Sequence, residues 1–425
     1  MPFERQLDFR VGNGIFKKIW VSSPSSTQSS DGLGPLFNAR SCQRCHLKDG
    51  RGHPPAAGET PVSMFLRLSI PPQTEDDRTA LATYLASVIP DPAYGGQLQN
   101  FSIQGHDAEG DMKIAYEEEI VTLGDGTEVK LRRPVYEAVN LKYGPMHPDV
   151  MLSPRVASPM IGLGLLEAIR AEDILAGADP EDKDGDGISG RPNWAFNHET
   201  GEVELGRFGW KAGEPSVAQQ SAAAFHGDIG ISTPLFRTHY GDCREGAQDS
   251  CRDAPHGGTR DGTVTEATDD MFERVVFYSR NLAVPTRRDV DDPQVLAGKK
   301  LFYESGCISC HTPKFVTRRD AISEEQSFQL IWPYSDMLLH DMGPGLADNR
   351  PEGAASGQEW RTQPLWGVGL TEAVSGHTLL LHDGRARNVL EAILWHGGEA
   401  QAARDNVAAM PAEDREALLA FINSL

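Results

Sequence analysis

Two short segments of the sequence combine cysteine and histidine in the pattern Cys-x-x-Cys-His, which can tether a prosthetic group. The first segment holds Cys42, Cys45 and His46, and the second holds Cys307, Cys310 and His311. On one helical turn, two cysteines at this spacing can each form a thioether with a vinyl group of haem, and the histidine can ligate the iron. The two segments therefore predict two covalently bound c-type haems.

A redox-active dithiol or a zinc site is the alternative interpretation of a Cys-x-x-Cys pair. We favour haem because the complete pattern, histidine included, occurs twice. Haem of this type is attached outside the cytoplasm, so we expect a periplasmic or secreted protein. The first residues, MPFERQLDFRVGNG, lack the basic and apolar regions of a secretory signal, and we expect that signal to be missing from this sequence.

The composition is that of a globular protein with a strong acidic bias. Its 425 residues carry a formal net charge of −21. Such a surface repels nucleic acid and anionic membranes, so we exclude both as partners, while a soluble electron-donor protein with a basic face fits it. No stretch of about 18 apolar residues is present, so we expect no membrane span.

The two remaining cysteines, Cys243 and Cys251, lie close together in the polar segment GDCREGAQDSC. In an oxidising compartment, such a pair predicts a disulfide that closes a small loop. Free thiols or a metal site are the alternative, but no pattern of cysteine or histidine at zinc spacing surrounds the pair.

Local patterns predict a few regular elements among many loops, since the chain contains 43 glycines and 28 prolines. Alternating residues around a glycine-rich turn predict a hairpin over 121–137. Apolar residues at helical spacing predict a helix within 158–179 and another within 411–425. Asp292 followed by Pro293 predicts the start of a helix that leads into the second motif.

A polar, proline-bounded segment over 285–294 predicts a boundary between two domains. We expect the N-terminal domain, 1–285, to hold the first motif and a long irregular insertion with minor β structure. The C-terminal domain, 286–425, should hold the second motif and two crossing helices that approach closely at Gly298. The expected fold is mainly α, with two cytochrome c-like haem domains. No internal repeat is evident beyond the duplicated motif.

An acidic segment follows the pattern of a calcium-binding loop. Asp182, Asp184 and Asp186 stand at positions 1, 3 and 5, and Gly187 stands at position 6. The pattern departs at position 12, where Asn193 replaces the usual bidentate glutamate. The segment is equally consistent with a calcium site and with a plain acidic turn.

Longer segments carry a resemblance to the bacterial diheme oxidoreductases known as thiol oxidoreductases. They are GLGPLFNARSCQRCHLKDGRG, DGDGISGRPNW, GRFGWKA, LAVPTRRD, GCISCHTPKF, YSDMLLHDMGPGLAD, EWRTQPLWGVGL and LHDGRARNVLEAILWHGGEA. This family is related to diheme cytochrome c peroxidases, to the methylamine-utilisation diheme enzyme and to rubber oxygenase. The resemblance runs from about residue 12 to residue 425, and it implies a diheme enzyme.

The resemblance implies that the C-terminal iron has two protein ligands, the second one on the helix after an HDGR-type turn. In this sequence that position is His396, so we expect His311 and His396 to ligate one iron. His382 and His340 are rivals, although each is expected to bond backbone or a haem propionate. Ligation by two histidines suits an electron relay.

The haem on His46 is then the expected reactive site. His53 is a less favourable second ligand, because it lies only seven residues after His46 and two prolines follow it. Peroxide cleavage needs a positioned acid–base group. Glu167 is our first candidate for that role, and His147 and Glu137 are weaker ones.

The resemblance also implies a tryptophan between the two haems. Trp210 and Trp194 are the candidates, although a core aromatic is the ordinary role of each. Arg361, Arg385 and Arg387 lie in the C-terminal segments of the resemblance, and arginine suits haem propionates as a bidentate donor.

These expectations describe a diheme peroxidase-like enzyme, in which electrons enter at the C-terminal haem and reduce hydrogen peroxide at the N-terminal haem. Three alternatives stay open. The chain could oxygenate or oxidise an organic substrate, it could transfer electrons without catalysis, or it could form a radical-type oxidant that modifies a protein partner.

Overall fold

The computed structural model describes residues 1–259 and 262–425. Its helices are α1 (Phe3–Lys17), α2 (Cys42–Cys45), α3 (Glu75–Ala82), α4 (Leu163–Glu167), α5 (Ala171–Leu175), α6 (Val217–Ala224), α7 (Asp249–Arg252), α8 (Asp269–Arg280), α9 (Pro293–Glu304), α10 (Thr371–Ser375), α11 (Val389–Leu394), α12 (Gln401–Ala409) and α13 (Ala412–Ser424). None of these helices is long and apolar enough to cross a lipid bilayer.

Among the described residues, the strands form two-stranded sheets. The antiparallel pairs are β1 (Leu36–Phe37) with β3 (Phe101–Ser102), β2 (Met64–Ser69) with β6 (Met151–Val156), β4 (Asp111–Thr122) with β5 (Glu128–Val139), β7 (Trp194–Asn197) with β8 (Glu202–Leu205), β9 (Phe315–Val316) with β10 (Leu330–Ile331), and β11 (Leu339–Asp341) with β12 (Glu359–Arg361).

This architecture corrects the expected fold class. Helices account for only 30% of the chain and strands for 17%, so the fold is not mainly α and does not consist of two cytochrome c-like domains. The physical reason lies in the many glycine- and proline-rich loops, which interrupt the helices and leave short strands that pair over long sequence distances. Met64 of β2, for example, pairs with Val156 of β6.

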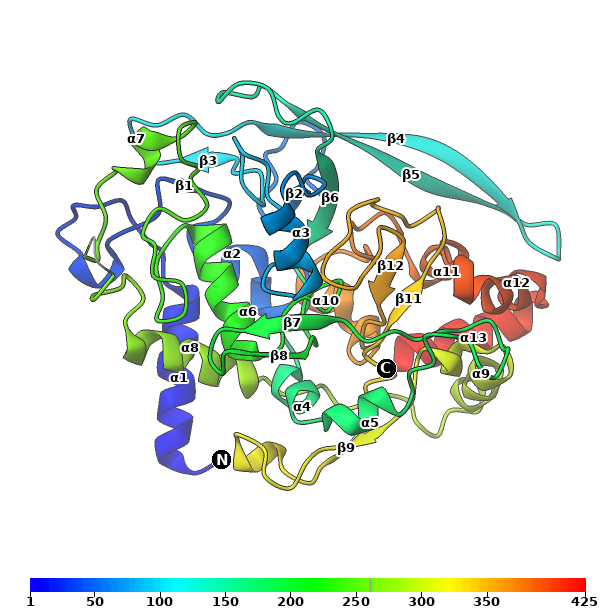
Figure 1. Ribbon diagram of the computed structural model, residues 1–425. Helices are drawn as coiled ribbons and strands as arrows, with labels where there is room; N and C mark the ends of the chain where they lie inside the picture. Colours follow the sequence, from blue (N-terminus) through cyan, green and yellow to red (C-terminus); the bar gives the residue numbers. More distant parts are fainter. Residues whose placement is uncertain (260–261) are drawn as a thin grey trace.

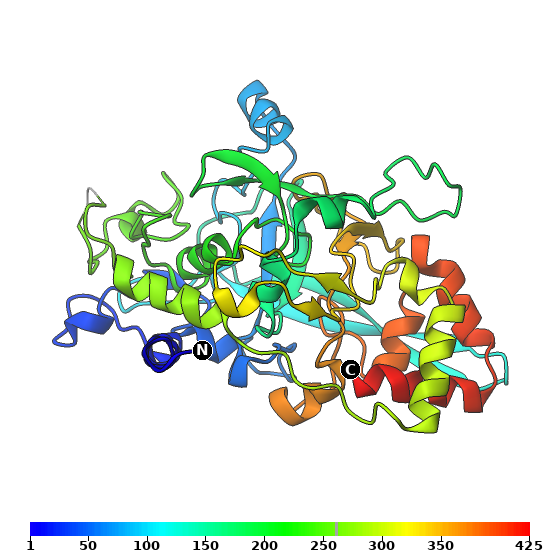
Figure 2. The same ribbon diagram turned by 90° about the horizontal axis from the view of Figure 1, so that it is seen from below.

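The elements fall into two groups that lie side by side (Figures 1 and 2). Helices α1, α2, α6 and α8 lie on one side, and α9, α11, α12 and α13 lie on the other. Strands β2, β6, β11 and β12 run between them. The segment 281–292, between α8 and α9, contains no helix or strand. The predicted domain boundary at residue 286 falls within this segment and stays a prediction.

The predicted hairpin is confirmed and is longer than expected, since β4 and β5 pair from Asp111–Val139 to Thr122–Glu128. Its tip extends over the C-terminal helices (Figure 1). There, the backbone N–H of Gly124 donates to the carbonyl of Ala408 over 2.8 Å. The hairpin therefore ties the N-terminal part of the chain to the C-terminal part.

The helix predicted within 158–179 forms as two short helices, α4 and α5. The chain leaves the helical conformation at Arg170, which has a ψ of 142°. Just before it, Ile169 forms a β-bridge with Thr317. Pairing with a distant segment thus overrides the local helical pattern.

The predicted helices around the second motif are confirmed. Asp292 caps α9 by accepting hydrogen bonds from the backbone N–H groups of Gln294 and Val295. Helix α9 crosses α13 at Gly298, where a Cβ atom would lie 1.8 Å from the carbonyl oxygen of Ala417. Only glycine permits this close approach.

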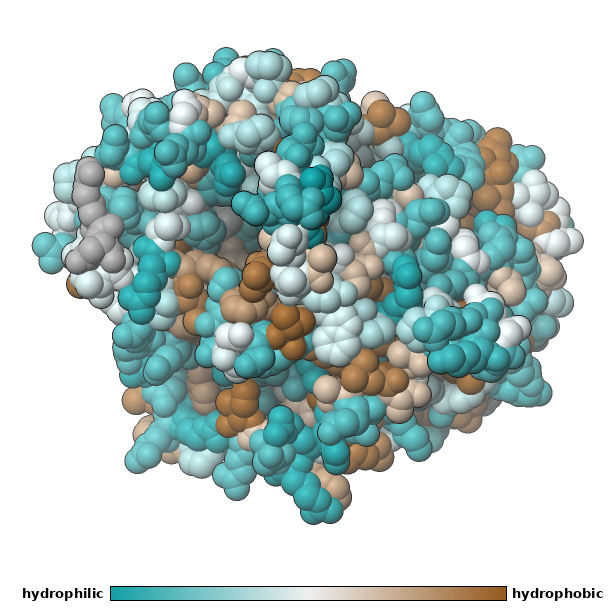
Figure 3. Space-filling model, in the orientation of Figure 1, coloured by the Kyte–Doolittle hydropathy of each residue, from teal (hydrophilic) through white to brown (hydrophobic). Residues whose placement is uncertain are grey.

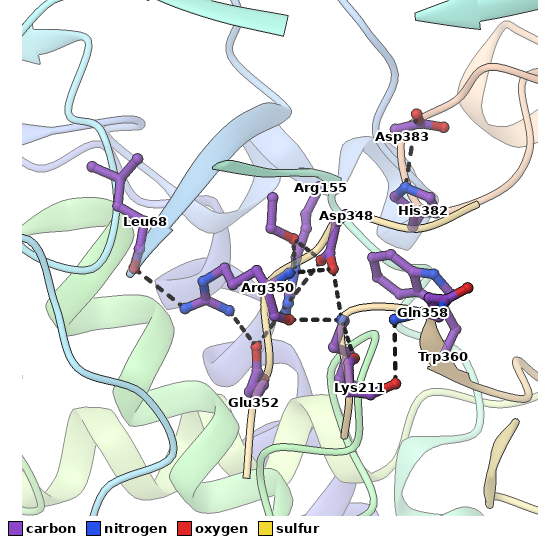
Figure 4. A network of polar contacts seen from close by, with 12 residues as sticks. Leu68, Arg155, Lys211, Asp348, Arg350, Glu352, Gln358, Trp360, His382 and Asp383 are labelled. Atoms are coloured by element: carbon purple, nitrogen blue, oxygen red, sulfur yellow. Dashed lines mark hydrogen bonds and ion pairs between the residues drawn. The ribbon is translucent and has the colours of Figure 1, made fainter. Parts of the chain in front are cut away.

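A buried network of charges connects the two parts of the chain (Figure 4). Lys211 is 0% exposed, and its Nζ donates to Oδ1 of Asp348 over 2.7 Å. Oδ2 of the same aspartate accepts from the hydroxyl of Ser153 over 2.6 Å. Because residues 153 and 211 precede the linker and residue 348 follows it, the network fixes one part against the other.

Gly298→Ala should destabilise the protein by about 1–3 kcal/mol, because the added methyl group separates two well-packed helices. Gly14→Ala is the matched control, since Gly14 is also helical but has no atom within 4 Å of the added Cβ position. That change should leave stability unchanged or raise it by about 0.5–1 kcal/mol. Denaturant unfolding of both variants tests the close approach, and equal effects would contradict it.

Lys211→Met should destabilise the protein by about 3–5 kcal/mol, because Asp348 then lies buried without its cation. The double variant Lys211→Met/Asp348→Asn removes both charges and should recover most of the loss. Thermal unfolding of the single and double variants measures the coupling. Additive effects of the two changes would show that the pair does not act as a unit.

Candidate functional site

The first Cys-x-x-Cys-His segment lies in the wall of a cavity of about 310 Å³, which we call cavity 1. Cys42 begins helix α2, Cys45 ends it, and His46 follows directly. The ring of Phe16, from α1, lies 6.2 Å from that of His46. The face drawn in Figure 3 is hollowed beside α3, and Ser87, which follows α3, lines cavity 1.

The second segment lines a cavity of about 390 Å³, which we call cavity 2. Cys307, Cys310 and His311 lie in its wall, together with His396. Both histidines point Nδ1 at a backbone carbonyl: that of Tyr334 for His311, over 2.8 Å, and that of Ala392 for His396, over 2.7 Å. Each imidazole therefore keeps Nε2 for another partner.

The protonation states of these side chains suit haem. Burial lowers the pKa of His311 to about 4 and also lowers that of His396, so both are neutral, the form that ligates a metal. Burial raises the pKa of the Cys42 and Cys307 thiols to about 12. A redox-active dithiol needs a lowered thiol pKa, so the structure disfavours that alternative.

The surroundings of His46 test independently whether cavity 1 could hold a haem. The residue is half-buried and its Nδ1 atom is buried. Burial lowers its pKa, and backbone hydrogen bonds with Ser158 and Gly50 oppose this shift. A neutral imidazole beside the two motif cysteines, in the wall of a cavity, fits a haem ligand. Both cavities thus offer the donors that a covalently attached haem requires.

The two cavities are bounded by corresponding helices, a repeat that the sequence analysis missed. Ser216 caps α6 and Asn388 caps α11, each by accepting from the backbone N–H three residues later. The eighth residue after the cap is Ala224 in cavity 1 and His396 in cavity 2. Trp210 lies six positions before the cap residue Ser216, and His382 lies six positions before the cap residue Asn388. This equal spacing is visible in the sequence.

Several side chains line both cavities, among them Arg51, Trp210 and Arg361. The indole N–H of Trp210 donates to the carbonyl of Val156 over 2.9 Å, and the Arg51 guanidinium lies 5.6 Å from the centre of its ring. Burial lowers the pKa of both arginines to about 10, which still leaves them cationic at neutral pH. The shared wall therefore combines an aromatic ring with two positive charges.

The other predicted tryptophan and arginines lie elsewhere. Trp194 begins β7 and does not line either cavity. Arg385 binds Asp383 over 2.8 Å, and Arg387 binds Glu391 over 2.7 Å.

His340 and His382 line cavity 2, but their surroundings differ. Both nitrogens of His340 contact carboxylates, those of Asp336 and Glu399, over 2.7 Å. Burial opposes the charge of His340, but these hydrogen bonds outweigh burial and raise the pKa to about 12. Burial lowers the pKa of His382 to about 4, and its ring stacks on Trp360 at 3.9 Å.

The predicted acid–base residues lie outside both cavities. Glu167 accepts hydrogen bonds from Arg280 over 2.5 Å and from the backbone N–H of Val217 over 2.8 Å. Glu137 pairs with Lys113 on the exposed hairpin. His147 lies 4.0 Å from Asp149.

The alternative ligand His53 also lies outside both cavities. Its Nδ1 contacts the carbonyl of Pro54 over 2.7 Å, and its ring lies 5.0 Å from that of His377.

Glu214 is a residue of cavity 1 that the sequence analysis missed. Its Oε2 atom is buried and has no hydrogen-bond partner among the described residues. Burial raises its pKa to about 7. No local pattern marks this residue, because its surroundings come from distant segments.

The acidic loop brings its three carboxylates together. Ligand atoms of Asp182, Asp184 and Asp186 lie within 4.8 Å of one another. Asp186 also lines cavity 2. The Sγ atoms of Cys243 and Cys251 lie at bonding distance, with their Cα atoms 6.1 Å apart.

Comparison with known protein families agrees with two haem sites built from the cysteines and histidines of the two motifs. The sequence model of a family described as "Di-haem oxidoreductase, putative peroxidase" matches residues 5–425. No curated protein matches the chain. Among solved structures, hydrazine synthase of Kuenenia stuttgartiensis, pressurised with 20 bar xenon, is similar at 13% identity over 84% of this chain and 90% of that chain, with a TM-score of 0.33. Because the family model spans nearly the whole chain, this protein belongs to the di-haem oxidoreductases.

Proposed function

We propose that the protein is a peroxidase-like diheme enzyme that reduces hydrogen peroxide in cavity 1 with electrons received at cavity 2. The observation that carries this proposal is the contrast between two corresponding positions, Ala224 in cavity 1 and His396 in cavity 2. A histidine can close an iron to added ligands, whereas an alanine cannot. The same scaffold would thus build one reactive site and one relay site.

The residues that would hold the haems are those of the two motifs. Cys42 and Cys45 would form thioethers in cavity 1, with His46 as the iron ligand. Cys307 and Cys310 would do so in cavity 2, with His311 and His396 as ligands. Bound there, haem iron supplies reversible one-electron chemistry and, where one position stays open, binding of a small oxidant.

Trp210 is the side chain that we assign to electron transfer between the cavities, because it lines both of them. The hydrogen bond from its indole N–H to the carbonyl of Val156 holds the ring in place. Arg51 and Arg361 also line both cavities and are suited to bind propionates, since a guanidinium donates to a carboxylate in a bidentate manner. A soluble donor protein would supply the electrons.

The wall of cavity 1 is mostly apolar, as a haem site requires, and it also contains a group of charged side chains. Arg67, Arg350, Glu214 and Glu352 all lie in its wall. Burying a hydrocarbon chain against these groups would remove their hydration without replacing it, which is unfavourable. The charged part of the wall therefore suits a small polar oxidant, while the apolar part does not argue against an organic substrate.

A periplasmic or secreted location is part of the same proposal. Covalent haem attachment requires export, and an oxidising compartment would also permit a disulfide between Cys243 and Cys251. The bonding distance between their sulfur atoms supports that pairing.

Cyanide titration of the oxidised protein tests the contrast between the cavities. The native protein should bind one cyanide per chain and show one high-spin and one low-spin iron by electron paramagnetic resonance. Ala224→His should abolish cyanide binding and convert the high-spin signal to low-spin, because imidazole then closes the iron. His396→Ala should raise the stoichiometry to two.

Ala224→Leu is the control for steric effects, since leucine adds bulk without a ligand and should keep the high-spin signal. Two low-spin irons in the native protein, with no response to cyanide, would leave a pure electron-transfer protein and contradict the proposed catalysis.

We also propose that the acidic loop binds calcium. Carboxylate oxygens that already lie close together are the ligands that calcium prefers. Calcium should raise the thermal unfolding temperature of the chelator-treated protein, and Asp184→Asn should remove most of this increase. Magnesium at the same concentration is the control. An unfolding temperature that does not respond to calcium would identify a plain acidic turn.

A further inference from the structure

Glu214 occupies an unusual position for a carboxyl group. It lies two residues before the cap of α6, the helix that carries Ala224 into cavity 1. Its Oε2 is buried without a hydrogen bond, although a buried carboxylate oxygen normally has a partner. Because the residue lines cavity 1, its carboxyl group is placed to exchange a proton with a molecule inside that cavity.

A side-chain hydrogen bond with Gln219 favours the ionised form of Glu214, and two charged groups act on it from distant segments. Glu352 disfavours ionisation of Glu214, and Arg67 favours it. Arg155 and Arg350 each contact Glu352 over 2.7 Å, and they hold the pKa of that carboxyl well below its usual range against the effect of burial. Glu352 therefore stays ionised, and Glu214 is the member of this cluster that can change its protonation.

We propose that Glu214 accepts the proton of a neutral, protic ligand that enters cavity 1, so that the cavity selects small molecules of the type H–X. The proposal rests on the proposed function, in which cavity 1 binds hydrogen peroxide. In the step, the H–X bond breaks, an O–H bond forms on the carboxylate of Glu214, and the anion X⁻ stays in the cavity. One proton moves, and nothing is oxidised or reduced.

The electrostatics of the cluster favour this step near neutral pH. Burial is the main cause that raises the pKa of Glu214 to about 7, so the group is partly ionised and ready to accept a proton. An anion left beside it raises the pKa further, because like charges disfavour ionisation. Arg67 lines the same cavity and is suited to attract that anion.

Asp228 is the competing acceptor in cavity 1. Its Oδ1 already accepts a hydrogen bond from Nε2 of Gln97 over 2.9 Å. The carboxyl group of Glu214 likewise takes part in a side-chain hydrogen bond, with Gln219. The Glu214→Gln variant described below decides between the two acceptors.

The experiment counts the protons released when the oxidised holoprotein binds hydrogen cyanide, a neutral H–X molecule. Calorimetry in buffers of different ionisation enthalpy gives this number without turnover. At about pH 5.5 Glu214 is already protonated, so one proton should reach the solvent, whereas at about pH 8.5 Glu214 should retain it and almost none should be released. The change should be centred near the pKa of free Glu214.

Glu214→Gln should release one proton at every pH, since an amide cannot accept it. Glu202→Gln is the matched control, because Glu202 is an exposed carboxyl of β8, and it should behave as the native protein does. Arg67→Gln should move the transition to higher pH, because it removes the charge that favours ionised Glu214.

Release of one proton at all pH values by the native protein would overturn the proposal. So would a transition that persists in Glu214→Gln, which would assign the role to another group such as Asp228. A native protein that binds no cyanide would instead contradict the open site of the proposed function. The two failures are therefore distinguishable.

Discussion

The burial of the Lys211 ammonium group is the constraint on which the rest of the structure depends. A fully buried cation is stable only when it is paired and hydrogen-bonded, and Lys211 binds Asp348 and two backbone carbonyls. Burial still lowers its pKa to about 8. Because Trp210 is the preceding residue, the network also fixes the indole ring that lines both cavities.

This constraint gives the two cavities a common wall but leaves their chemistry different. Corresponding capped helices, α6 and α11, bound them, and only the second helix leads to a histidine, His396. Cavity 1 contains ionisable groups with unequal surroundings, of which Glu352 is held by two arginines and Glu214 is not. A single scaffold thus provides a site that exchanges protons and a site in which histidine nitrogens are available for a metal.

Local chemistry explains which parts of this structure could be predicted from the sequence. The two motifs, the hairpin and the helix capped by Asp292 depend on neighbouring residues, and a local pattern is enough to find them. The fold class could not be found in this way. It depends on pairings such as that of β11 with β12, in which the sequence of one strand does not indicate the position of the other.

The acid–base residue could not be predicted for the same reason. Glu167 lies on a recognisable helix, yet Arg280, more than a hundred positions away, engages its carboxylate. Glu214 lies in a loop without a pattern, and besides nearby Gln219 it is influenced by Arg67 and Glu352, which lie far from it in the sequence. By contrast, the repeat that relates Ala224 to His396 depends only on spacing, so the sequence does contain it.

The predicted boundary at residue 286 separates the two motifs, but it does not separate the two cavities. Arg350, Glu352 and Arg361 follow the boundary and line cavity 1, while Arg51 and Trp210 precede it and line cavity 2. A chain that ended at residue 285 would keep His46 and its cysteines. It would lose Glu352, which disfavours the ionisation of Glu214, and the carboxylate that pairs with Lys211. The protonation of Glu214 in cavity 1 therefore depends on residues from both parts of the chain.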